Sequence, residues 1–130
     1  MIKLSNILTE SLTKQMIVNI ANELFKYYNA NQLELKFTND KTLLGNFDFD
    51  NNIVYVNPNY NKEEITITIL HEIKHLLQKK SIGKSKFIHN CEIELSNGKD
   101  QKSVSYEIEA EKWANSEYNK IWKNKLFGEK

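Results

Sequence analysis

The sequence has very few of the residues that cross-link or interrupt a chain. Cys91 is the only cysteine, so an intramolecular disulfide and a structural zinc site built from several cysteines are both excluded. Pro58 is the only proline and there are only 4 glycines, so no Pro-rich or Gly-rich linker divides the chain. We therefore expect one domain over residues 1–130, a length that supports one hydrophobic core.

Long apolar runs and an excess of one charge are also missing. No segment is apolar for long enough to span a bilayer, and the first residues lack the apolar run of a signal peptide, so we expect a cytoplasmic protein without a membrane partner. The 18 basic and 17 acidic side chains leave a net charge of +1, which predicts no nucleic-acid partner. The composition indicates a globular chain and leaves its oligomeric state open.

The first half of the chain predicts a helix followed by strands. Apolar residues recur at three- and four-residue steps over residues 9–28, which is typical of an amphipathic helix. Residues 33–37 alternate between apolar and charged side chains, as a half-buried strand does. Two β-prone runs joined by Asn51 and Asn52 predict a hairpin, because asparagine tolerates the left-handed backbone of a tight turn. The second strand of this hairpin consists of Ile53, Val54, Tyr55, Val56 and Asn57.

The second half predicts two longer helices. Asn61 is a typical N-cap, and Glu64 stands three residues later, as in a capping box. Residues 65–69 alternate like a strand, but the helical spacing of the apolar residues that follow favours a helix over 62–80. Residues 81–102 are polar and suit loops with room for one short strand. A last helix over 103–123 is expected to direct an apolar set inward: Val104, Ile108, Trp113, Ile121 and Trp122. The whole is an α+β fold with a small sheet.

The pattern H-E-x-x-H occupies residues 71–75. Residues four apart share one face of a helix, so His71 and His75 can present ring nitrogens to a single ion. Zinc suits neutral imidazoles, which it binds at about 2.0–2.1 Å. Glu72 lies beside them and can take a proton from water activated by the metal and pass it to the leaving amine. The competing interpretation is that both histidines only pack or hydrogen-bond on a helix.

A peptidase site needs a third protein ligand, with the fourth position left for water. The metzincin extension is excluded, because it requires glycine and histidine where the chain has Gln78 and Ser81. His89 and Cys91 could both reach the ion from the irregular segment, and both stay open as ligands.

Acidic residues of the last helix are the other candidates for the third ligand. Glu107 and Glu111 are four apart, and two carboxylates on one face repel each other unless a positive group such as a ligated metal lies near them. We expect Glu107 to bind zinc and Glu111 to accept the second N–H of a ligand histidine. Ala110 and Ala114 would let the two helices approach closely. Glu109 is an alternative ligand in the same run, and a solvated acidic face is the alternative to the whole idea.

With these two helices, the sequence resembles the gluzincin class of metallopeptidases, in particular the minigluzincins and the ImmA/IrrE-like peptidases. In that class a second helix carries a motif that reads roughly E-x-x-A-[N/D]-x-[F/W]-A, matched here by Glu107, Ala110, Glu111, Trp113 and Ala114. The resemblance covers about residues 45–118 and departs at Glu111, where the class has Asn or Asp. It implies a small zincin-like domain with one zinc ion on His71, His75 and Glu107, and Glu72 as the general base.

The resemblance also implies hydrolysis of peptide bonds in a peptide or protein substrate, and we expect an endopeptidase rather than an exopeptidase. Residues 53–57 would be the edge strand that pairs with the extended substrate. His89, Tyr106 and Tyr118 are candidates for stabilising the transition state.

Two other interpretations stay open. One is a zinc-binding regulatory module of the same fold without catalysis. The other is a metal-free helical interaction protein that docks a partner through exposed aromatic residues, namely Trp113, Trp122 and Phe127.

Overall fold

The computed structural model describes residues 13–39, 45–48, 50–83, 86, 89–90, 92–93, 96–98 and 105–128. Their elements in chain order are helix α2 (Lys14–Tyr27), strands β1 (Glu34–Phe37), β2 (Gly45–Asp48) and β3 (Ile53–Val56), helix α3 (Lys62–Ile82), and a helical run made of α5 (Ser105–Glu117), η2 (Tyr118–Trp122) and α6 (Lys123–Phe127). The expected α+β class is confirmed. Within these residues, no helix combines the length and apolar content needed to cross a membrane.

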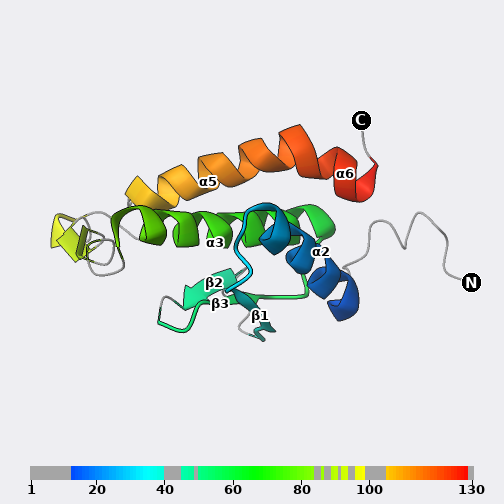
Figure 1. Ribbon diagram of the computed structural model, residues 1–130, viewed down its shortest axis with the longest axis horizontal. Helices are drawn as coiled ribbons and strands as arrows, with labels where there is room; N and C mark the ends of the chain where they lie inside the picture. The colour runs from blue at the N-terminus through cyan, green and yellow to red at the C-terminus, as the bar shows by residue number, and fades with distance from the viewer. Residues whose placement is uncertain are drawn as a thin grey trace, which may run out of the picture.

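Helix α3 lies at the centre of the molecule. Figure 1 shows α5 and α6 along one side of α3 and the sheet on the other, while α2 packs near one end. A helix covered on both sides buries residues around most of its circumference, and not along a single stripe. The buried residues of α3 are Ile65, Thr66, Ile69, Leu70, Glu72, Ile73, His75, Leu76 and Gln78. Three polar side chains, Glu72, His75 and Gln78, are therefore held inside the fold.

The start of α3 follows the expected cap. The Asn61 side chain accepts a hydrogen bond from the Glu64 N–H at 2.8 Å. The strand-like run of residues 65–69 is helical, and each of its two threonines donates its hydroxyl to the carbonyl oxygen four residues earlier at 2.7 Å. The helix continues to Ile82, two residues past the expected end, and stops at Gly83, whose φ of 88° breaks the helical path.

The three-stranded sheet overturns one prediction. β3 is the central strand: it pairs in parallel with β1 and antiparallel with β2, in the order β1-β3-β2. Both edges of Ile53–Val56 are therefore occupied, so this segment is not the edge strand expected over 53–57 and cannot add a peptide. The hairpin itself is confirmed, and Asn52 at its turn has the left-handed φ of 56°. Asn57, just past the strand, is buried.

Strand β2 has an outer edge, and its backbone orientation follows from the pairing. The Val56 carbonyl accepts from the Thr38 N–H at 2.9 Å on the β1 side. Backbone groups alternate sides along a strand, so those of Tyr55 face β2 and pair with Asn46. Phe47 then directs its N–H to the outer edge, where the Asn46 side-chain oxygen accepts it at 2.9 Å.

The helix packing on α3 corrects the expectation that Ile108 faces inward and confirms those for Ala110, Ala114 and Trp122. Ile108 is 43% exposed, while Ala110 and Ala114 are completely buried. Trp122 is also completely buried, and its indole N–H donates to the Tyr28 hydroxyl at 2.8 Å. Trp122 therefore cannot dock a partner, and the metal-free interaction protein loses a main part of its support.

The remaining differences concern element ends. The last helical run continues to Phe127, beyond the expected end at 123. Residues 103 and 104 lie outside the described residues, as does the start of the first predicted helix, residues 9–12. Of the residues described between α3 and α5, none lies in a strand, so the short strand allowed for in 81–102 is not found among them.

Candidate metal centre

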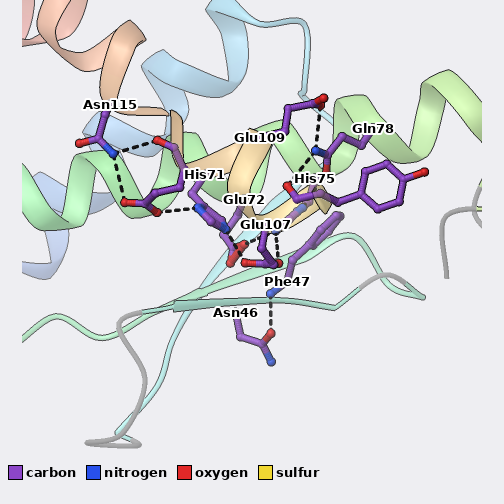
Figure 2. A network of polar contacts seen from close by, with 11 residues as sticks. Asn46, Phe47, His71, Glu72, His75, Gln78, Glu107, Glu109 and Asn115 are labelled. Atoms are coloured by element: carbon purple, nitrogen blue, oxygen red, sulfur yellow. Dashed lines mark hydrogen bonds and ion pairs between the residues drawn. The ribbon is translucent and has the colours of Figure 1, made fainter. Parts of the chain in front are cut away.

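Helices α3 and α5 bring two histidines and one glutamate to a single point. The ring nitrogens of His71 and His75 face the carboxylate of Glu107: His71 Nε2 is 3.0 Å from one carboxylate oxygen, and His75 Nε2 is 2.7 Å from the other. One ligand atom from each of the three residues can be chosen so that all lie within 4.8 Å of one another. Figure 2 shows these side chains converging from the two helices, with Glu72 beside them.

The outer nitrogen of each imidazole also has a partner. His75 Nδ1 is 2.8 Å from the side-chain oxygen of Gln78, and His71 Nδ1 is 3.1 Å from a carboxylate oxygen of Glu111. Both oxygens only accept hydrogen bonds, so each Nδ1 carries the proton. The two Nε2 atoms are consequently the ring positions that can give a lone pair to a metal ion.

The ligand atoms lie close enough together to hold a metal ion. Tetrahedral ligands at about 2.0–2.1 Å from zinc lie about 3.3 Å from one another. The observed nitrogen–oxygen separations of 3.0 and 2.7 Å are instead those of hydrogen bonds between each imidazole and the carboxylate. An ion bound here would replace these contacts, and Glu107 is one-third exposed on the open side of the cluster.

The charges in this cluster shift the pKa values of its members. Burial alone would raise the pKa of Glu107, but hydrogen bonds from His71 and His75 lower it to about 2. Burial would likewise lower the pKa of each histidine, but the hydrogen bond with Glu107 and the charge of Glu72 raise both. The metal-free site therefore favours ionised Glu107 between protonated imidazoles, and a metal cation can take over the role of those protons.

Glu72 is buried beside His75. Its side chain is 7% exposed, and one carboxylate oxygen is 3.8 Å from His75 Nε2. Burial raises the pKa of Glu72, partly opposed by the positive charges of His75 and His71. A raised pKa brings a carboxylate closer to the range in which general bases work, so the general-base role expected of Glu72 is compatible with this position.

The alternative ligands lie elsewhere or have other partners. The carboxylate of Glu109 accepts from Gln78 at 3.0 Å and lies 3.7 Å from the Lys74 ammonium. His89 is exposed and does not belong to the metal-binding group found among the described residues. Cys91 lies outside the described residues. Glu111 contacts His71 from the outer side, and Asn115 holds it there at 3.1 Å.

The proposed stabilisers of the transition state are only partly near the site. Tyr118 is a buried core residue 11 positions after Glu107, which corresponds to about 16 Å along a helix, and this position does not support a role at the cluster. The hydroxyl of Tyr106 accepts from Asn90 at 2.9 Å, and its backbone carbonyl accepts from Gln78. Tyr106 thus adjoins the site through its backbone.

Sequence reasoning overlooked Gln78, which is buried between the two helices. Its only signal in the sequence was its place three residues after His75, a spacing that puts both side chains on one helical face. Phe47 was also overlooked; it is 5% exposed, and Figure 2 shows it with Asn46 on the strand side of the cluster.

The site thus consists of two imidazoles and one carboxylate from two helices, with an acceptor behind each imidazole. This donor set suits a divalent transition metal such as zinc. Comparison of the chain with protein-family models, with curated proteins and with solved structures gives no match.

Proposed function

We propose that this protein is a zinc-dependent metallopeptidase of the gluzincin type. His71, His75 and Glu107 hold one zinc ion, and Glu72 is the general base. The observation that carries the proposal is the convergence of the His71 and His75 Nε2 atoms on the Glu107 carboxylate. Glu72 is buried beside His75 at the same point. A cluster that served only to join two helices would not need Glu72 as a fourth residue, a second carboxylate that is buried beside His75.

Each residue contributes one part of the reaction. A bound zinc ion supplies a Lewis acid that polarises a carbonyl and lowers the pKa of water to about 7. Glu72 takes the proton of the attacking water and delivers it to the leaving amine, so that the peptide C–N bond breaks and an acid and an amine are released. Gln78 and Glu111 keep the two imidazoles turned toward the reaction centre.

β3 is enclosed, whereas β2 has an outer edge, at Gly45 and Phe47, with no paired strand among the described residues. Figure 2 shows Phe47 beside the cluster, so this edge is the surface we assign to β-strand addition by an extended peptide. β2 packs closely on α3: a Cβ atom on Gly45 would lie 2.8 Å from the Tyr55 carbonyl oxygen and would also meet the Thr68 side chain. Backbone pairing along this edge would bring a peptide past the metal with little demand on its sequence.

Metal content and cleavage together test the proposal. We expect purified wild-type protein to contain close to one zinc per chain and to cleave members of a broad library of unstructured peptides. Glu72→Gln removes the base but none of the ligands, so it should keep the zinc and lose cleavage by at least about 100-fold.

The other outcomes are equally informative. Zinc without cleavage by the wild type would replace the peptidase with a zinc-binding regulatory module of the same fold. Failure to take up zinc even when it is supplied would overturn both, because the cluster would then be only an ion-pair network.

A further inference from the structure

We propose that Gln78 is a positioning residue of the metal centre, which orients His75 and holds the glutamate-bearing helix in place with the same amide group. This inference rests on the proposed metal site and adds a determinant to it. Gln78 follows His75 by three positions on α3 and is 5% exposed, so the environment of its amide is fixed by protein atoms.

The amide oxygen acts on the histidine. It lies 2.8 Å from His75 Nδ1, and because it can only accept, it keeps the proton on that nitrogen. Nε2 is then left toward Glu107 at 2.7 Å. A neutral acceptor performs here the function that the Glu111 carboxylate performs for His71, so the two ligand histidines have supports of different charge.

The amide nitrogen acts on the other helix. It donates to the Tyr106 carbonyl oxygen and to the Glu109 carboxylate, each at 3.0 Å. These two residues lie on either side of Glu107 in the chain. Figure 2 shows the contact between Gln78 and Glu109 as a dashed line. One planar amide thus connects the ligand on α3 to the backbone that carries the ligand on α5. Such a connection fixes the separation of His75 and Glu107 before any metal binds.

The test measures zinc affinity by competition with a chromophoric chelator. Gln78→Met keeps the size and burial of the side chain but removes both halves of the amide. We expect it to weaken zinc binding by about 10- to 100-fold, the loss typical of a lost outer-sphere partner. Thr66→Val is the matched control: Thr66 is equally buried on α3, and its hydroxyl bonds only to the carbonyl of Lys62 at 2.7 Å. Thr66→Val should bind zinc with an affinity within about twofold of the wild-type value.

A second pair of variants separates positioning from packing. Gln78→Glu combined with Glu109→Gln keeps an acceptor for His75 Nδ1 and a hydrogen bond to residue 109, but it loses the donor to the Tyr106 carbonyl. We expect it to recover only part of the zinc affinity that Gln78→Met loses. In the cobalt-substituted protein, Gln78→Met should change the visible d–d spectrum at full occupancy, which a general loss of stability would not do. If Gln78→Met does not fold, the reversed pair and its cobalt spectrum decide.

The outcomes separate this inference from the metal site itself. Unchanged zinc affinity and cobalt spectrum in Gln78→Met, with zinc bound normally by the wild type, overturn the role of Gln78 and leave the metal site intact. A reversed pair whose cobalt spectrum is the same as that of the wild type also overturns it, because a charged acceptor on His75 Nδ1 should change the donor strength of the imidazole. A wild type that takes up no zinc overturns both.

Discussion

At the scale of single residues, Glu107 and Glu109 offer a matched comparison two positions apart on one helix. Only Glu107 faces the Nε2 atoms of the two histidines, while Glu109 lies against Gln78 and Lys74. Glu107→Ala should weaken zinc binding by more than about 100-fold, the upper end of what outer-sphere losses give. Glu109→Ala should weaken zinc binding far less than Glu107→Ala does. Metal analysis after dialysis measures both, and an equal loss in the two variants would mean that the ligand has been misassigned.

The histidine pKa shifts predict how the metal-free protein responds to pH. The pKa values of His71 and His75 are raised above 6.5 by Glu107 and Glu72, against the opposing effect of burial. The folded state then binds more protons than the unfolded chain, so this contribution to stability is complete below pH 6.5 and is lost as pH rises through the folded pKa values. Urea denaturation in the presence of a chelator should show that fall.

Glu107 acts at the acid end of the same pH profile. Its pKa is lowered from 4.5 to about 2, so its contribution is present above pH 4.5 and is lost as pH falls toward 2. Glu107→Gln should weaken the dependence of stability on pH both below pH 4.5 and above pH 6.5. It removes the negative charge that interacts with His71 and His75. With zinc added, the stability of the protein should rise with pH above pH 6.5 instead of falling, since the ligands bind metal only when deprotonated. Stability of the metal-free protein that rises with pH in this range would contradict the assigned shifts.

The two histidines of the site could be predicted from the sequence, whereas Gln78 could not. His71 and His75 stand out because their spacing has one strong physical meaning on a helix. Gln78 has no such signature: a glutamine on a helix is usually solvated, and only the packing of α5 against α3 makes it a buried partner of His75. The rise of a helix already separates Tyr118 from Glu107, and the packing of the last helical run on the core shows that Tyr118 is a core residue.

At the scale of elements, the approach of α5 to α3 depends on small side chains. Ala110 is completely buried and Ile108 is 43% exposed, although hydrophobicity alone would have placed them the other way round. Ala110→Leu should cost about 1–3 kcal/mol of unfolding free energy by overpacking, and should also weaken zinc binding because Glu107 moves outward with its helix.

Ile108→Ala is the natural control for that helix. Being exposed, it should change stability by no more than about 0.5 kcal/mol and leave zinc affinity unchanged. Chemical denaturation of the two variants with and without zinc makes the comparison. A larger loss for Ile108→Ala than for Ala110→Leu would show that the inner face of α5 is wrongly placed.

The elements themselves were predictable where local signals agreed. The Asn61 cap and the helical spacing after Leu70 outweighed the strand-like alternation of residues 65–69, and α3 is helical throughout. The role of β3 was not predictable, because its parallel partner β1 ends well before it in the chain and the pairing is non-local. A segment's propensity to form a strand says nothing about how many of its edges will be occupied.

At the scale of the whole molecule, the proposed metal site joins α5 to the central helix α3, so zinc bound there should stabilise the entire fold. Free zinc at 100 times the dissociation constant adds about 2.7 kcal/mol, which for a domain of this size raises the melting temperature by roughly 10 °C. Thermal denaturation over a zinc titration measures the shift. Glu107→Ala should show almost none of it, while His89→Ala should match the wild type. A wild-type melting temperature that does not change with zinc concentration would contradict this expectation.

The outer edge of β2 has a consequence for how copies of this chain behave toward one another. Among the described residues, no strand pairs with that edge, and exposed edges invite strands of neighbouring molecules to join. The Phe47 N–H at this edge is already satisfied by the Asn46 side chain. A neighbouring strand must first break that hydrogen bond, so non-specific edge-to-edge aggregation is disfavoured. This is the same edge at which we propose that a peptide binds. Asn46→Ala, which leaves the Phe47 N–H open to a neighbouring strand, should therefore increase self-association through this edge.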